Sequence, residues 1–337
     1  MPGLENLMFK PTISDDSKFA VFAFSNLRQA HDMNTFIGPV DDYVFAKNMI
    51  DFSRGEWEKW IGERKYKGIL SSNYCVVRQL VSENPGILDS ETKMLEDDFI
   101  LLYQTLMITI PYASHRESFL FIGHNTDDSV DFRQMRIYPD VPHLIGSPDV
   151  VVNSEIIERA ITIQHRISKY FLATSHKRLF AMIGAFMKGI QSKNVAERVH
   201  QFIRCIEGFL HPDPGKTRKQ FKSRTELFLG PQKHQLVDEL YEIRSNIEHL
   251  HSPFETYPLV DETTAQLKIF MRALQAEFIA RSLLLEILLK DRLADLFQSK
   301  DALEKFWDGS NSKRTGLVEV IPDPEKEISL EMLSKDN

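Results

Sequence analysis

The chain has 337 residues, of which 42% are hydrophobic and 26% are charged, and its formal net charge at pH 7 is −7. This length allows two domains with one sizeable core each, and the acidic balance argues against a general nucleic-acid binder. Its two cysteines, Cys75 and Cys205, exclude a disulfide framework and a cysteine-rich zinc site, and they are typical of a reducing compartment.

The beginning of the chain, residues 1–12, lacks the basic and apolar regions of a signal peptide. The longest apolar run, 99–110, is too short to cross a bilayer and contains a glutamine and two threonines. We therefore expect a cytoplasmic protein without a membrane contact.

Residues 1–150 predict a mixed domain of the α+β class. Aromatic-rich or alternating runs predict strands at 19–24, 118–123 and 132–138, and helical patterns lie at 56–61 and 91–110. Trp57 and Trp60 are three residues apart, which suits packing from one helix face. This half shows neither a glycine-rich phosphate loop nor a cluster of metal ligands, so it predicts no metal or cofactor site.

The segment 139–148 contains proline and glycine and predicts a connector. An all-α domain follows over 151–305, so that the whole chain is mainly α. Helices are predicted at 155–172, 176–191, 194–210, 218–229, 233–251 and 262–297. The polar, acidic residues 306–337 predict a loosely ordered tail.

Charge is distributed unevenly along this helical half. Residues 156–232 hold 14 lysines and arginines against five acidic residues, a local charge of +9 that leaves −16 for the rest of the chain. Such a segment is either a footprint for a polyanion or a set of solvated helix faces. Five of its cations are the best candidates for contacts with an RNA backbone: Lys216, Arg218, Lys219, Lys222 and Arg224.

The helix predicted at 233–251 carries the strongest candidate for chemistry. Its apolar residues recur every three or four positions and form one stripe, with Arg244 on the flank. His249 lies five residues further on, which places it about 140° around a straight helix from Arg244. The two side chains therefore meet only if the helix end is distorted or if a second copy of the helix supplies the partner, as in a symmetric dimer.

Arginine and histidine suit the cleavage of RNA without a metal. Arginine is a permanently charged, forked donor for phosphate, and histidine exchanges a proton near neutral pH. RNA carries its own nucleophile, the 2′-hydroxyl, so a base, an acid and a cation are sufficient. The alternative without catalysis is that Arg244 forms a surface ion pair with Glu248, four residues further along the helix.

The segment 240–250, with the sequence LYEIRSNIEHL, resembles the R-x(4–6)-H signature helix of the HEPN superfamily (higher eukaryote and prokaryote nucleotide-binding), and it is most similar to the Apea-like branch. The upstream order of a helix with arginine and glutamate at 202–210, a Pro/Gly turn to 215, and a helix with a basic start at 216–224 is also similar. The resemblance covers about residues 150–300 and does not cover the N-terminal half.

The resemblance implies a helical domain that dimerises and often cleaves RNA, in proteins that recur in toxin–antitoxin and antiviral defence systems. It assigns catalysis to Arg244 and His249, with Asn246 as the polar residue within the motif. Ser245 departs from the Asn, Asp or His that often follows the arginine in active members, and some members only bind. Glu207, on a preceding helix, is predicted to contact Arg244, most simply as an ion pair that holds the two helices together.

Three hypotheses follow. The leading one is an HEPN-type, metal-independent endoribonuclease that needs no cofactor, acts on RNA as a homodimer through its helical domain, and is restrained by a neutralising partner protein. The second is a non-catalytic HEPN-like dimer that binds RNA, a nucleotide or a protein. The third places the chemistry in the N-terminal half, for which the sequence indicates no residues.

Overall fold

The computed structural model describes residues 13–14, 16–25, 27, 37–40, 42–46, 57–72, 74–82, 84, 86, 88–125, 130–144, 147, 152–172, 175–310 and 314–329. Contacts between Cα atoms divide the chain into two compact units. The first unit comprises Met1–Leu106, Ala113–Val141 and Asp149–Gln164. The second comprises Met107–Tyr112, Pro142–Pro148 and His165–Asn337.

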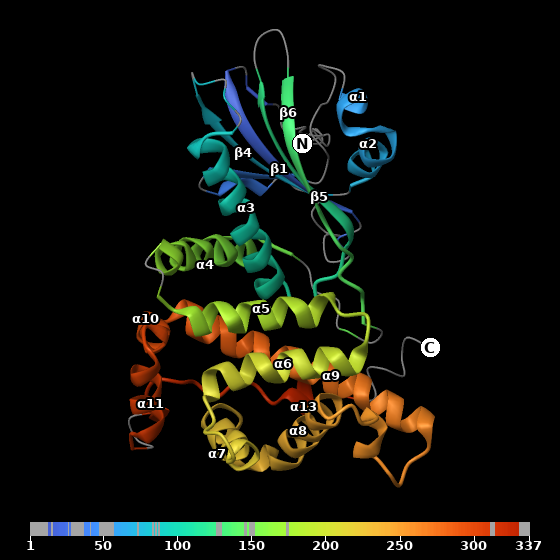
Figure 1. The fold of residues 1–337 in the computed structure, drawn as a ribbon, viewed down its shortest axis with the longest axis vertical. Helices are drawn as coiled ribbons and strands as arrows, with labels where there is room; N and C mark the ends of the chain where they lie inside the picture. Colours follow the sequence, from blue (N-terminus) through green and yellow to red (C-terminus); the bar gives the residue numbers. More distant parts are fainter. Residues whose placement is uncertain are drawn as a thin grey trace, which may run out of the picture. The chain divides into compact units, whose positions relative to one another are not determined.

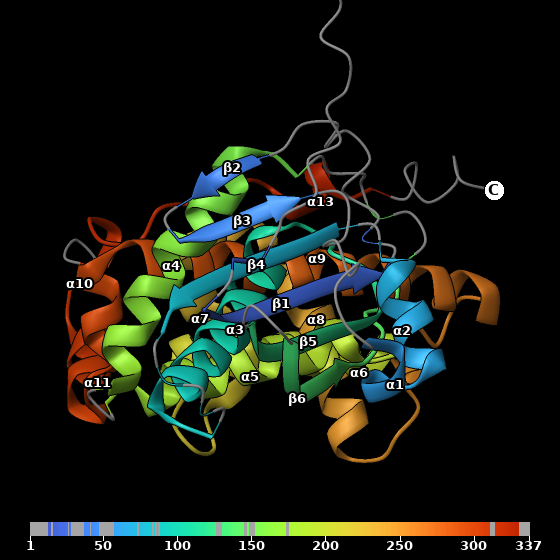
Figure 2. The same ribbon diagram turned by 90° about the horizontal axis from the view of Figure 1, so that it is seen from above.

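The first unit is built on a six-stranded antiparallel sheet with the strand order β2-β3-β4-β1-β5-β6 (Figure 2). Its strands are β1 Ser17–Ser25, β2 Ile37–Val40, β3 Tyr43–Ala46, β4 Tyr74–Val81, β5 Arg116–Asn125 and β6 Val130–Tyr138. Its helices are α1 Trp57–Ile61, α2 Glu63–Leu70, α3 Ser90–Thr109 and the first part of α4 Ser154–Leu172.

Strand β1 is buried along its whole length because side chains on both faces of the sheet are covered. Phe19, Val21 and Ala23 belong to a core cluster that includes Ile69 of α2. Phe22 points to the opposite face, where its ring stacks 5.2 Å from that of Tyr103 of α3. A strand covered in this way has a nearly continuous apolar sequence instead of an alternating one.

The predicted strands at 19–24, 118–123 and 132–138 are confirmed as parts of β1, β5 and β6, and the predicted helices at 56–61 and 91–110 correspond to α1 and α3. The side chains of Trp57 and Trp60 lie outside the described residues, so their packing stays a prediction. Strands β2, β3 and β4 and helix α2 were not predicted from the sequence.

The second unit is helical in the part that the structure describes (Figure 1). Its helices are α5 Lys177–Gln191, α6 Val195–Leu210, α7 Thr217–Leu229, α8 His234–Glu248, α9 Glu262–Leu289, α10 Asp291–Ala294, α11 Lys300–Asp308 and α13 Pro324–Glu327. Helix α6 is the centre of the unit, since it packs against α5, α8 and α9. The prediction of a helical C-terminal half is confirmed, whereas an HEPN-like arrangement of its helices stays a prediction.

The structure differs from the predicted boundaries in three places. The chain passes between the units after Val141 and after Pro148, within the predicted connector 139–148, but it passes again inside α4, after Gln164. Helix α8 ends at Glu248 rather than at residue 251. The helix predicted over 262–297 is interrupted at Lys290, whose backbone, with φ −116° and ψ 108°, leaves the helical region.

The acidic tail also differs from the expected loose order over residues 314–329. Val318, Pro324 and Ile328 are buried, and the carbonyl of Ile328 accepts a hydrogen bond of 2.9 Å from the side chain of Gln275 on α9. Lys233 lies 2.6 Å from a carboxylate oxygen of Asp323. Apolar contacts and paired charges therefore order a segment whose composition is polar.

Candidate functional site

Helix α8 ends in a turn that fixes the two histidines beyond it. The backbone N–H of Leu250 donates to the carbonyl of Ile247 at 3.1 Å, and that of His251 donates to the carbonyl of Asn246 at 2.7 Å. Leu250 has a φ of 60°, in the left-handed region where helix ends usually have glycine. This Schellman turn makes His249 the residue that caps the helix and leaves both histidines exposed.

Arg244 lies on the side of α8 that faces α6. Its guanidinium donates to Glu207 of α6 at 3.3 Å and to Glu248 one turn further along α8. It also lies over the ring of Tyr241, 5.8 Å from the ring centroid. The predicted contact between Arg244 and Glu207 is therefore confirmed, and the two side chains are only 15% and 13% exposed.

The ion pair between Arg244 and Glu207 is incompletely satisfied. Nε of Arg244 and Oε1 of Glu207 are buried, and neither has a hydrogen-bond partner among the described residues. Burial raises the pKa of the Glu207 carboxyl, although the charge of Arg244 acts in the opposite direction. A buried acid with a shifted pKa beside a cation is typical of functional sites. The unpartnered Nε alone does not distinguish such a site, because Nε of Arg281 on α9 is also buried without a partner among the described residues.

A histidine that the sequence reasoning did not single out is connected to this pair. His200 of α6 lies 3.4 Å from Glu248 through Nε2 and 3.4 Å from Glu197 through Nδ1. His200, Arg204 and Glu207 are spaced by four and three residues, so they share one face of α6. That spacing was available in the sequence, but only the packing of α6 on α8 shows which face meets Arg244.

His249 is not joined to Arg244 by any contact among the described residues. Its backbone N–H donates to the carbonyl of Ser245 at 3.0 Å, and its ring lies 6.3 Å from the ring of His251. Within the described part of the chain, the His249 side chain forms neither a hydrogen bond nor an ion pair. Although the helix ends just before His249, a single copy of the chain does not pair the two predicted catalytic residues.

Asn246 and Ser245, the two other residues predicted within the motif, form hydrogen bonds that stabilise the end of α8. The side-chain amide of Asn246 donates to the hydroxyl of Thr256 at 3.1 Å, which ties the end of α8 to the short helix η3 Pro253–Thr256. Ser245 is half-buried, and its carbonyl accepts the hydrogen bond from His249. Both residues therefore help to hold the turn that presents His249.

The predicted RNA-binding stretch on α7 is partly neutralised by α8. Lys222 forms an ion pair with Asp238, and Arg218 lies 3.2 Å from Glu242 and 3.8 Å from Asp238. These pairs reduce the positive potential that the sequence of α7 predicts.

The remaining cations of the stretch are arranged differently from one another. Arg224 donates to the carbonyls of Leu210 and His211 at 2.6 and 2.5 Å, and its guanidinium lies 5.1 Å from the ring centroid of Trp307. Lys216 lies 3.8 Å from Asp213. Lys219 is exposed and has no carboxylate partner among the described residues. The structure therefore leaves fewer free charges on α7 than the sequence does.

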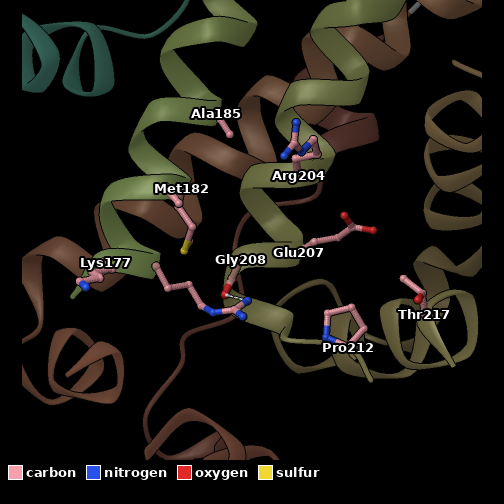
Figure 3. Close-up of a pocket in the computed structure, with 10 residues that line it drawn as sticks. Lys177, Met182, Ala185, Arg204, Glu207, Gly208, Pro212 and Thr217 are labelled. Carbon is pink, nitrogen blue, oxygen red and sulfur yellow. Dashed lines mark hydrogen bonds between the residues drawn. The ribbon is translucent and has the colours of Figure 1, made fainter. Parts of the chain in front are cut away.

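A pocket of about 540 Å³ lies between α5, α6 and the beginning of α7 (Figure 3). Its charged residues are Lys177 and Arg178 from the start of α5, and Arg204 and Glu207 from α6. Glu207 is thus both a wall of the pocket and the partner of Arg244. The other lining residues are Ala181, Met182, Ala185, Gly208, Pro212 and Thr217.

The sequence reasoning did not single out Lys177, Arg178 or Arg204. They were part of the basic segment 156–232, but 26 positions separate Arg178 from Arg204 in the sequence. Their convergence depends on the packing of α5 against α6, for which no local pattern gives a signal. Within the described residues, no group of three or more histidine, cysteine, aspartate and glutamate side chains is placed to hold a metal ion.

Among the helices that the structure describes, none combines the length and apolar character needed to cross a membrane. Comparison of the chain with known protein families, with characterised proteins and with solved structures finds no match. The case for a function therefore depends on the site itself and on the motif of α8.

Proposed function

We propose that this protein is a metal-independent endoribonuclease of the HEPN type, with Arg244 and His249 as its catalytic pair. The observation that carries the proposal is the position of Arg244. It is an incompletely bonded arginine whose partner Glu207 forms a wall of a pocket that also holds three cations. A cation placed beside a positively charged pocket suits a phosphodiester substrate.

The proposed reaction uses the RNA chain as its own nucleophile. A base removes the proton of the 2′-hydroxyl, the 2′-oxygen forms a bond to phosphorus, and the bond from phosphorus to the 5′-oxygen breaks. An acid returns a proton to the 5′-oxygen, which leaves a 2′,3′-cyclic phosphate and a free 5′-hydroxyl. Arg244 stabilises the charge on the phosphoryl oxygens, and His249 transfers protons.

A homodimer through the helical unit would supply the meeting of Arg244 and His249 that a single chain lacks. The segment after His249 exposes three large apolar side chains, those of Leu250, Phe254 and Leu259, at 94, 36 and 96%. Exposed apolar groups next to a proposed active site support a surface that another copy covers. We place this enzyme in the cytoplasm, in a toxin–antitoxin or antiviral role with a neutralising partner protein.

The second candidate function is a non-catalytic HEPN-like dimer that binds RNA, a nucleotide or a protein partner. One observation favours it: the guanidinium of Arg244 already donates to Glu207 and to Glu248. An arginine held between two carboxylates is less available to a phosphoryl group than an unpaired one. This candidate predicts salt-sensitive RNA binding without turnover.

The test is digestion of single-stranded RNA in the presence of EDTA by wild type, Arg244→Ala and His249→Ala. We expect Arg244→Ala to lower the cleavage rate by about 10²–10³, the usual effect of removing one donor to a developing oxyanion. We expect His249→Ala to lower it by about 10²–10⁴, the usual contribution of one general acid or base. Products with 2′,3′-cyclic phosphate ends identify the attack by the 2′-oxygen.

The matched control is His251→Ala, because His251 is an exposed histidine two residues beyond the proposed catalytic one. It should cleave at the wild-type rate. Cleavage that survives both catalytic substitutions would refute the site, and cleavage that EDTA abolishes would refute the metal-free mechanism. Loss of activity in His200→Ala with full activity in His249→Ala would move proton transfer to α6. RNA binding without any turnover by wild type favours the second candidate.

A further inference from the structure

We infer that the pocket lined by Lys177, Arg178 and Arg204 is a binding site for one phosphate-bearing nucleotide. The inference rests on the proposed function in one respect only: the adjoining site is taken to act on RNA. The ligand is either one nucleotide of an RNA chain or a free mononucleotide, since both offer the same phosphate and base.

The charges of the pocket are not compensated in the way that others in the basic segment are. Lys222 is paired with Asp238, and Arg166 lies 3.1 Å from Asp291. Lys177, Arg178 and Arg204 are exposed, and none of them forms an ion pair with a carboxylate among the described residues. These three cations line one hollow, and the Arg178 guanidinium donates to the carbonyl of Gly208 at 3.5 Å (Figure 3). An anion bound there would gain their attraction without first breaking a salt bridge.

Two helices begin at this pocket. Helix α5 starts with Lys177, and its N-cap residue His176 makes no side-chain hydrogen bond to the helix end. Helix α7 starts with Thr217, and its N-cap residue Lys216 makes none either. The first N–H groups of a helix lack partners within the helix and carry partial positive charge, so a phosphate bound beside either helix start would be attracted by them as well.

The remaining wall of the pocket is small or apolar instead of charged, which suits a nucleobase. Ala181, Met182 and Ala185 of α5 and Gly208 of α6 are small or apolar. A Cβ atom added to Gly208 would lie 2.1 Å from Cγ of Met182, so the glycine is what permits α5 to approach α6 so closely. A volume of about 540 Å³ lies within the usual range of small-molecule sites, and an apolar wall beside a few charged groups is their usual composition.

The position of Glu207 relates this pocket to the proposed active site. Its carboxylate lines the pocket and accepts the hydrogen bond from Arg244, so a nucleotide bound there lies one side chain away from the proposed catalytic arginine. A bound nucleotide of an RNA chain would thereby hold the neighbouring phosphodiester near Arg244. Such positioning of a substrate by groups outside the reacting atoms lowers the barrier to reaction.

The test measures binding without cleavage. The probes are a 2′-O-methyl RNA oligonucleotide, which lacks the attacking hydroxyl, and adenosine 5′-monophosphate. The variants are Arg178→Glu and Arg204→Glu, with Lys188→Glu as the matched control because Lys188 is an exposed lysine of α5 outside the pocket. We expect each pocket variant to weaken binding about tenfold or more, the effect of losing one charge-assisted hydrogen bond. The slope of log K against log salt for the oligonucleotide should become shallower by about 0.7 for each phosphate that the variant no longer neutralises.

The two probes distinguish the sources of the nucleotide. Loss of oligonucleotide binding alone identifies the pocket as a subsite for RNA. Loss of mononucleotide binding, with oligonucleotide binding intact, identifies a site for a free nucleotide. Equal weakening by Lys188→Glu and the pocket variants, or no binding of either probe to wild type, overturns the inference. Arg244→Ala separates the two proposals: it should lower the cleavage rate by about 10²–10³ and leave adenosine 5′-monophosphate bound, so each proposal fails on a different measurement.

Discussion

Arg281 and Arg244 both lie on helices of the second unit, and each donates to a glutamate one helical turn away. Arg281 of α9 is 4% exposed, and besides Glu277 it donates to the carbonyls of Met107, Ile108 and Ile110 at 2.7–2.9 Å. Arg244 of α8 is 15% exposed. Its acceptors are two carboxylates, and it lies beside the pocket wall.

This difference in acceptors and burial separates an arginine that stabilises the fold from one whose guanidinium can be released to a ligand. Neutral carbonyls cannot give up their place to a phosphate without leaving buried acceptors unsatisfied, so Arg281 is fixed in the core. The carboxylates around Arg244 can instead take up a proton or turn to water, since Glu248 is 38% exposed and the pKa of Glu207 is already raised by burial. The guanidinium of Arg244 is therefore the more easily released of the two.

The largest expected effect on stability tests the role of Arg281 in the core. Substitution Arg281→Met leaves Glu277 buried without its closest cation and removes the donor of three carbonyls. We expect the free energy of unfolding to fall by about 3–5 kcal/mol, the usual result of breaking a buried pair from one side. Urea denaturation followed by circular dichroism of the helices measures it.

The matched variant is Arg244→Met, which makes the same replacement at the pocket wall. Its loss should be below about 2 kcal/mol, because Glu248 reaches solvent and Glu207 can bind a proton. Equal losses in the two variants would break the comparison, since Arg244 would then serve the fold as Arg281 does.

The sequence predicted the helices around Arg244 but not the tertiary contacts that order the rest. Strand β4 has the sequence YCVVRQLV, in which the first four residues are all buried. It pairs with β1 and β3 in the interior of the sheet, so it lacks the alternation by which a strand is recognised. The end of α9 at Lys290 likewise has no proline or glycine to mark it.

Contacts between residues far apart in the sequence explain why the order of the tail and the pocket were not predicted. Lys233 forms ion pairs with Asp323 and Glu325, which lie about 90 positions further along the chain. The local composition around Lys233 gives no indication of such distant partners. The sequence placed Arg244 and Glu207 on two amphipathic helices, α8 and α6, but only the packing of these helices brings the two side chains into contact. Packing alone decides which cations are neutralised by a nearby carboxylate, as Arg218 and Lys222 are.

A smaller expected effect tests the surroundings of Arg244 through the pH dependence of the stability that Glu207 contributes. Burial raises the pKa of Glu207 above its ordinary value of 4.5, with Glu248 acting in the same direction and Arg244 and His200 against it. The folded state then binds this proton more tightly than the unfolded state, so the stability that Glu207 contributes is full below about pH 4.5 and is lost as the pH rises through the folded value. Glu207→Gln lacks this dependence and keeps the shape of the side chain.

We therefore expect wild type to lose stability relative to Glu207→Gln as the pH is raised from 4.5 towards neutrality, by less than Arg281→Met costs. Parallel urea denaturation of the two proteins across this range measures the difference, in which the other carboxyl groups cancel. A constant difference, or wild type gaining on the variant, would mean that Glu207 is as well stabilised in its charged form as a core glutamate.

The smallest effect concerns the surface, where Asp238 neutralises cations of α7. Asp238 is 31% exposed and pairs with Lys222 and Arg218. Asp238→Asn should change stability by less than about 1 kcal/mol, as exposed ion pairs do. If the α7 stretch contacts an RNA backbone, freeing its two cations should strengthen oligonucleotide binding about threefold and steepen the salt slope by about 0.7 for each additional phosphate neutralised. Asp291→Asn, which changes the net charge equally beside Arg166, is the control. An unchanged affinity would assign RNA contact to the unpaired cations of the pocket alone, because charges that remain paired contribute little to a polyanion's attraction.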